Sequence, residues 1–200
     1  MQSRDFLRWT LPPWPNLKVN FDGSVFQDEN CASMGVIIWD WNDQVVASMA
    51  EAFPLPFSMT AVEVIVASKA LCLANDLGLS SIMLEGDSKI TMDALAGENS
   101  SLAEDGHLVD EANELAKDFA YIEFSHVLRQ KNSAAHNIAR HARHVNEYSV
   151  WMEDVPPHLF SVIQADLASL WKKLQCFSQK NKKQIERLKK KVKIIYRLRE

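Results

Sequence analysis

The sequence predicts an α/β fold in which a mixed sheet of five strands carries packed helices. Short apolar or alternating segments are typical of strands, and longer segments with apolar residues three and four apart are typical of helices. Along the chain these segments come in the order three strands, a helix, a strand, one or two helices, a strand and a helix. This order favours three antiparallel strands followed by two more.

The first three strands are expected at 18–22, 34–40 and 44–51. The first alternates with period two, the other two are apolar, and a turn-like Asn42-Asp43 pair separates them. Three prolines between 11 and 17 exclude the start of a helix or a central strand there. Residues 1–16 are therefore expected to form an extended, proline-rich lead-in.

The rest of the domain alternates helices with strands. Residues 60–77 have helical spacing, with Ser58 or Thr60 as the cap and Gly78 at the end. Asn132 is expected to cap the last helix, which runs to about residue 145. The remaining segments are a strand at 81–85, helices at 88–96 and 105–119, and a strand at 121–128. The domain should therefore occupy 17–147, followed by an extension with an apolar-rich helix at 148–176 and a basic amphipathic helix or tail at 177–200.

Composition predicts a soluble, intracellular protein of the nucleus or cytoplasm, with no membrane contact. The first 14 residues include charged side chains and no apolar core of a signal peptide, and no apolar window is long enough to span a bilayer. The three cysteines are far apart and in no metal-ligand spacing, so free thiols are expected.

Charge is divided unevenly along the chain. Residues 172–200 hold 12 of the 22 basic residues and two of the 26 acidic ones, so this tail carries about +10 and the remainder about −14. An acidic body is unfavourable for binding a polyanion, so any nucleic-acid function must overcome that field.

Three carboxylates are candidates for a divalent-metal site. Asp22 is expected at the end of the first strand beside Gly23, and Asp87 at the carboxyl end of a later strand, where open α/β sheets place ligands. Glu63 lies on a helix face of small residues that suits close packing on the sheet, where a lone carboxylate needs a positive partner. Mg²⁺ with oxygen ligands would relieve their repulsion. From spacing alone, two turn acids and a surface glutamate remain the simpler alternative.

Four motifs in order resemble the plant ribonuclease H-like domain family, which occurs in retrotransposon-derived reverse-transcriptase polyproteins and as stand-alone genes. They lie at 17–24, 61–63, 84–88 and 124–142. The resemblance implies a type 1 ribonuclease H fold and hydrolysis of the RNA strand of RNA–DNA hybrids. It also implies that Asp22 bridges two Mg²⁺ ions while Glu63 and Asp87 hold one of them, so that one ion activates water and the other stabilises the departing 3′ oxygen.

His136 departs from that family's pattern. Ribonucleases H generally carry a fourth carboxylate in Asn-x-x-Ala-Asp, whereas this chain reads Asn132-Ser133-Ala134-Ala135-His136. The change removes a charge and an oxygen ligand, so reduced or Mn²⁺-biased activity is expected. His136 is interpreted as a hydrogen-bond or charge partner of the three acids, with solvent exposure and metal ligation as alternatives. His107, His126 and His141 are interpreted as structural or surface residues.

Candidate nucleic-acid contacts are Asn20, Ser24, Ser88, Arg129 and Lys131. The polar side chains could hydrogen-bond sugar and phosphate, and recognition of the ribose 2′-OH would favour RNA. The loop at 97–106, which is basic in some bacterial relatives, contains acidic residues here.

The basic tail allows several interpretations: phosphate contact, nuclear targeting through Lys189-Lys190-Lys191, partner binding, or a solvated helix without a role. Its apolar repeat is too short to predict an oligomer, so a monomer is expected. Two rival functions stay open. One is a nucleic-acid-binding module whose catalysis His136 has weakened, and the other is a non-catalytic interaction protein.

Overall fold

The computed structural model describes residues 15–42, 44–97, 105–145, 148–160 and 163. The chain divides into two units at residue 160, and every element below belongs to the first unit. The predicted lead-in before residue 15, most of the loop at 97–106, most of the helix expected at 155–168 and the basic tail lie outside the described residues.

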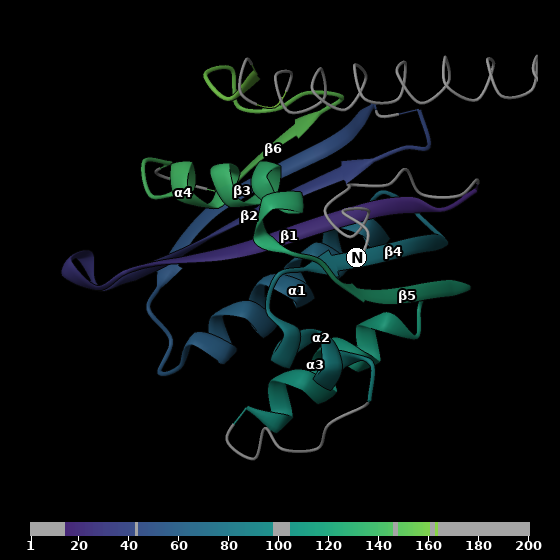
Figure 1. Ribbon diagram of the computed structural model, residues 1–200, viewed down its shortest axis with the longest axis horizontal. Coiled ribbons are helices and arrows are strands. Elements are labelled where there is room, and N and C mark those ends of the chain that lie inside the picture. The colour runs from purple at the N-terminus through teal and green to yellow at the C-terminus, as the bar shows by residue number, and fades with distance from the viewer. Residues whose placement is uncertain (1–14, 43, 98–104, 146–147, 161–162, 164–200) are drawn as a thin grey trace, which may run out of the picture. The chain divides into compact units, whose positions relative to one another are not determined.

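A mixed six-stranded sheet in the order β5-β4-β1-β2-β3-β6 forms the centre of the fold (Figure 1). The strands are β1 (Leu17–Phe26), β2 (Cys31–Trp39), β3 (Val45–Pro54), β4 (Ser81–Gly86), β5 (Tyr121–His126) and β6 (Ser149–Met152). β1, β2 and β3 pair antiparallel, and β4 and β5 continue the sheet parallel to β1. The predicted mixed sheet of three antiparallel strands and two further strands is confirmed.

The sixth strand corrects the predicted count of five. β6 pairs antiparallel with β3 from Ala47↔Met152 to Ala50↔Ser149. It begins after residue 147, where the domain was expected to end. A four-residue strand at a sheet edge gives too short an alternation to distinguish it from a loop by pattern.

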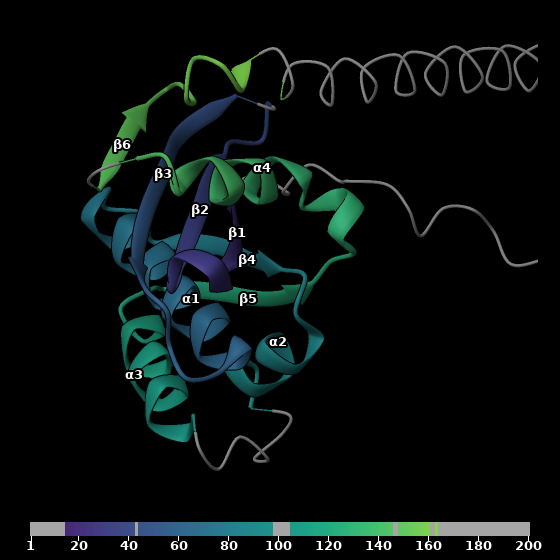
Figure 2. The same cartoon turned by 90° about the vertical axis from the view of Figure 1, so that its left-hand side faces the viewer.

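Helices cover both faces of the sheet. They are α1 (Met59–Asp76), α2 (Lys89–Leu95), α3 (Gly106–Ala116) and α4 (Ser133–Ala142), with single 3₁₀ turns η2 (Gln27–Glu29) and η3 (Arg129–Lys131). α1, α2 and α3 gather on one face and α4 lies on the other (Figure 2). Within the described part of the chain, no helix is both long and apolar enough to cross a membrane.

The α1 helix is anchored at its amino end and buried along most of its length. The Ser58 hydroxyl accepts a hydrogen bond from the Ala61 backbone N–H at 2.8 Å and donates one to Asp105 at 3.0 Å. Gly78, at φ +70°, follows its last turn. Gly23 of β1 allows close approach to α1, because a methyl group there would lie 2.7 Å from Val62. Glu63 is thereby brought against β1.

The α4 helix packs against small residues of β2. A methyl group at Gly35 would lie 2.3 Å from backbone atoms of Ala135 and Ala139. The Ser33 hydroxyl donates a 2.6 Å hydrogen bond to the Ala139 carbonyl. Since Asp22 pairs with Gly35 across the ladder, its side chain points to the same face, toward α4. The helix contact therefore places the residues of α4 next to Asp22.

Candidate metal centre

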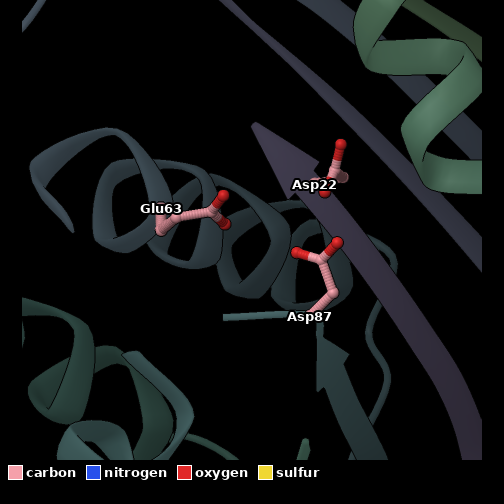
Figure 3. A group of neighbouring side chains, drawn as sticks. All are labelled: Asp22, Glu63 and Asp87. Carbon is pink, nitrogen blue, oxygen red and sulfur yellow. The ribbon is translucent and has the colours of Figure 1, made fainter. Parts of the chain in front are cut away.

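Three carboxylates from three elements converge at the centre of the sheet (Figure 3). Asp22 comes from β1, Glu63 from the first turns of α1, and Asp87 from the residue directly after β4. One oxygen of each lies within 4.8 Å of the other two. The three acids singled out from the sequence therefore share one site.

Asp22 is not at a strand end, contrary to the sequence-based expectation. β1 continues to Phe26 and pairs with β2 over its whole length beyond Asp22. The pairing with β4, however, stops at Asn20↔Glu85. β1 and β4 part just before Asp22, and this separation provides the space in which Asp22 and Asp87 face each other.

Burial and mutual repulsion make the site hard to ionise without a cation. Asp22 is 1% exposed, and burial, followed by the charges of Glu63 and Asp87, raises its pKa to about 9. Burial and then the charge of Asp87 raise the pKa of Glu63 to about 8, although Arg129 and a hydrogen bond from the Gly23 backbone oppose the shift.

The residues fit a hard divalent cation. Glu63 Oε2 is buried and has no hydrogen-bond partner in the described structure. A buried carboxylate oxygen without a partner is costly unless a cation binds it. The common donor set is three carboxylates, which are the ligands that Mg²⁺ and Mn²⁺ prefer.

His136 lies beside this group. Its Nδ1 is 2.8 Å from Asp22 Oδ2, and its side chain is 19% exposed. Burial and the positive charges of Arg129 and Arg140 lower its pKa, against the opposing charge of Asp87. The neutral ring can accept a proton from protonated Asp22 or donate one to the ionised carboxylate.

Arg129 brings a fixed positive charge to the same place. Its Nη2 lies 3.2 Å from Nδ1 and 3.4 Å from Nε2 of His136. Its charge lowers the pKa values of both Asp22 and Glu63. Arg129 therefore supplies part of the positive compensation that the sequence required, and does so from η3, outside the three acids.

The predicted nucleic-acid contacts divide into two groups. Ser24, Ser88 and Lys131 are half-buried and Arg129 is exposed, so part of each reaches solvent. Ser88 also caps α2 by accepting a 3.4 Å hydrogen bond from the Thr91 N–H. Asn20 is 2% exposed and donates to Glu85 at 3.0 Å and to Asn132 at 3.2 Å. Its amide serves the interior of the domain.

A buried polar network under the site was not identified from the sequence. Lys18 Nζ lies 3.0 Å from Glu85 Oε1, with the side chains only 1% and 5% exposed. Asn20 links this pair to Asn132, whose amide donates a 2.7 Å hydrogen bond to the Phe21 carbonyl. Asn132 thus stands at the expected N-cap position of α4, but its side chain ties the helix to β1 and does not cap it.

The signal for this network is present in the strand pattern. Lys18, Asn20 and Asp22 alternate with apolar residues, so all three face the same side of β1. Three polar residues on one face of a central strand require buried partners. The other histidines singled out lie apart from the acids, except that His126 Nε2 is 3.2 Å from the backbone oxygen of Asp87.

Comparison with known proteins gives the family. Residues 20–142 match the family described as reverse transcriptase-like. The chain belongs to that family. The match contains all three acids of the reverse transcriptase-like domain, together with Arg129 and His136. No curated protein matches the chain.

Solved structures share the ribonuclease H-like fold. RNase H1 from the halophilic archaeon Halobacterium salinarum is 25% identical, with a TM-score of 0.60 over 64% of this chain and 98% of that one. An N-terminal RNase H domain from Mycobacterium tuberculosis, fused to maltose-binding protein, is 23% identical, with a TM-score of 0.58 over 64% and 92%. LC11-RNase H1, isolated from compost and solved in complex with an RNA/DNA hybrid, is 17% identical, with a TM-score of 0.55 over 64% and 96%.

Proposed function

We propose that this reverse transcriptase-like domain is a metal-dependent endonuclease that hydrolyses the RNA strand of RNA–DNA hybrids. The observation that carries the proposal is the convergence of three carboxylates within 4.8 Å, two of which have raised pKa values. The hybrid in the LC11-RNase H1 structure supports the choice of substrate. The plant and retrotransposon character of the resemblance belongs to this proposal as well.

Asp22, Glu63 and Asp87 would hold the metal. Two bound ions, Mg²⁺ or Mn²⁺, supply a polarised water and neutralise charge on the departing 3′ oxygen. The protein positions the ligands on a strand, a helix and a strand end, so little reorganisation is needed at the moment of reaction. Glu63 gains the partner that its buried Oε2 lacks in the described structure.

His136 would control the protonation of Asp22. Its neutral ring donates Nδ1–H to Asp22 when that carboxylate ionises, and this holds the Oδ2 atom in place. It brings no negative charge, so the site would have three carboxylates where the family resemblance implies four. Weaker Mg²⁺ binding and a bias toward Mn²⁺, which tolerates nitrogen ligands better, follow from that difference.

Hybrid binding would use the polar and basic groups at the rim of the site. Arg129 and Lys131 stand on η3 immediately before α4, and Ser24 and Ser88 flank Asp22 and Asp87. Arginine and lysine contacts to phosphate position a nucleic acid without reading its sequence. The proposed selectivity for RNA rests on hydroxyl contacts to the 2′-OH.

A second candidate is a nucleic-acid-binding module with weakened catalysis. The observation that favours it is the approach of Arg129 to His136 and Asp22, because a fixed cation near the carboxylates competes with a metal ion. This module would bind hybrid but cut it slowly.

The test is cleavage of a labelled RNA–DNA hybrid by the full chain in Mg²⁺ and in Mn²⁺. Asp22→Asn and Glu63→Gln are the inactive comparisons, and a DNA duplex of the same sequence is the substrate control. Cleavage by the unchanged protein but by neither variant supports the nuclease. A folded protein that cuts in neither metal overturns it, and hybrid binding in Ca²⁺ then identifies the binding module.

A further inference from the structure

Three histidines form a cluster outside the carboxylate site. His141 lies in the last turn of α4, His144 follows the helix, and His158 belongs to the segment after β6. The ring centroids of His141 and His158 are 3.7 Å apart, and those of His141 and His144 are 6.2 Å apart. The fold has thus brought together imidazoles that are far apart in the sequence.

The cluster is accessible and suited to the unprotonated state. His144 and His158 are exposed and His141 is half-buried. Burial, followed by the proximity of His158 and His144, lowers the pKa of His141. Neutral imidazole is the form that binds metals. Two protonated rings at this separation would repel each other, so the contact itself favours neutral rings.

We propose that His141 and His158 anchor a site for a transition-metal ion of the Zn²⁺ class, with His144 as a third ligand and solvent in the remaining position. Imidazole nitrogen suits Zn²⁺, Ni²⁺ and Cu²⁺, whereas Mg²⁺ prefers oxygen. This site therefore selects a different class of ion from the carboxylates, and it is independent of the proposed nuclease function.

Ligation requires a side-chain rearrangement at His144. In the described part of the chain, only Asp22, Glu63 and Asp87 have ligand atoms within 4.8 Å of one another. His144 Nε2 accepts a 3.0 Å hydrogen bond from Arg143 Nε. Arg143 also has Glu29 at 4.0 Å and the Phe26 ring at 5.1 Å, so releasing His144 leaves its charge partnered. His144 should contribute less to affinity than the other two.

An ion at this site would tie the segment after β6 to the end of α4. β6 is a four-residue edge strand, and the ion would add a link between residues 141 and 158 that closes the chain around it. An ion that binds the folded state alone stabilises it by mass action. Zn²⁺ should therefore raise the melting temperature in addition to binding.

The test uses the full chain with saturating Mg²⁺, so that the carboxylates are already occupied. Calorimetric titration with Zn²⁺ should give one equivalent bound per chain. His141→Gln and His158→Gln should each weaken binding about tenfold or more, and His144→Gln should weaken it less. His107→Gln, at an exposed histidine on α3, is the matched control and should leave affinity unchanged.

Substitution of exposed His158 should not disturb folding, so this variant decides the outcome even if His141→Gln proves unstable. Zn²⁺ binding retained in the His141→Gln/His158→Gln double variant overturns the proposal, as does failure of the unchanged chain to bind. Binding abolished in Asp22→Asn but kept in His158→Gln would assign the ion to the carboxylates and also overturn it. None of these readouts depends on cleavage of nucleic acid.

Discussion

At the scale of single residues, the contact between Asp22 and His136 controls the charge of the site. The two side chains lie 2.8 Å apart, the pKa of Asp22 is raised to about 9 and the pKa of His136 is lowered. Near neutral pH the metal-free site therefore holds a proton on Asp22, which the carboxyl group donates to Nδ1. Cation binding must release this proton, so metal affinity is coupled to pH.

Asp22→Asn should stabilise the metal-free protein. Because the pKa of Asp22 is higher in the folded than in the unfolded state, folding takes up a proton between about pH 4 and about pH 9, and stability falls as pH rises through that range. The amide has no charge to bury, so the variant should gain about 1–3 kcal/mol near neutral pH and lose much of the pH slope. Urea unfolding in EDTA at about pH 5.5 and about pH 8 measures both. Parallel pH slopes for the two proteins would contradict this account.

His136→Asp should increase cleavage in Mg²⁺. The substitution supplies an oxygen ligand and a negative charge beside Asp22, and a gain of about tenfold or more is expected. Initial rates in Mg²⁺ and Mn²⁺ measure the change, and the ratio between the metals should shift toward Mg²⁺. His136→Ala is the control, because it removes the ring without adding a ligand. No gain by a folded His136→Asp variant would sink the ligand argument.

The sequence predicts the carboxylates better than their surroundings. Asp22, Glu63 and Asp87 carry a recognisable order and spacing, so their convergence could be anticipated. Lys18 and Glu85 could not be paired in advance, because their contact depends on the register of β1 against β4. A hydrogen bond between His136 and the acids was one of three open interpretations, since side-chain placement within a helix turn is not encoded in spacing.

At the scale of elements, the packing of α4 on β2 depends on the absence of a side chain at Gly35. The backbone of α4 occupies the position of a Cβ atom, at 2.3 Å from Ala135 and Ala139. Backbone cannot move aside as a flexible side chain can, so the helix must shift as a whole. Such a shift would also displace His136 from Asp22.

Gly35→Ala should destabilise the domain by about 2–4 kcal/mol, since overpacking a close helix–sheet contact forces backbone movement. Chemical denaturation gives the free energy of unfolding. Gly106→Ala is the matched control, because no atom lies within 4 Å of the added methyl group at the start of α3. Equal stabilities of the two variants would show that α4 can shift without cost.

The buried Lys18–Glu85 pair joins β1 to β4 directly below the site. Removing one partner leaves the other charge buried, so Lys18→Met and Glu85→Leu should each cost about 3–5 kcal/mol. The double variant should be more stable than either single variant, because no lone charge remains. A double-mutant cycle by urea unfolding measures this coupling, with the exposed Lys117 and Glu114 pair as the control. Additive losses would exclude a coupled ion pair.

Element boundaries show where pattern reasoning ends. α1 begins within one residue of its expected start because Ser58 provides a local cap, whereas β1 extends four residues past Asp22 because β2 continues to pair with it. β6 exists through its pairing with β3, and its four residues alone carry no strand signal. Local signals predict an element's type, and tertiary pairing decides its length.

At the scale of the whole molecule, charge is the property that most affects nucleic-acid binding. Residues 1–171 carry about −14 and residues 172–200 about +10, from the 10 and 12 basic residues set against 24 and two acidic ones. The acidic body repels a polyanion except where Arg129, Lys131 or a bound metal lies close. If the tail contributes to affinity, this contribution must depend strongly on salt.

Neutralising Lys189, Lys190 and Lys191 with glutamine in the full chain should weaken hybrid binding at low salt and reduce its salt dependence. Removing one lysine–phosphate interaction lowers the slope of log affinity against log salt by about 0.9, so removing three would lower it by up to about 2.7. Fluorescence anisotropy in Ca²⁺, across a salt series, measures the slope without cleavage. Lys117→Gln, on the exposed side of the body, is the control and should leave the slope unchanged. An unchanged slope in the triple variant would place the binding charge on η3, where Arg129→Gln should then reduce it, because the body must supply the phosphate interactions that the tail does not.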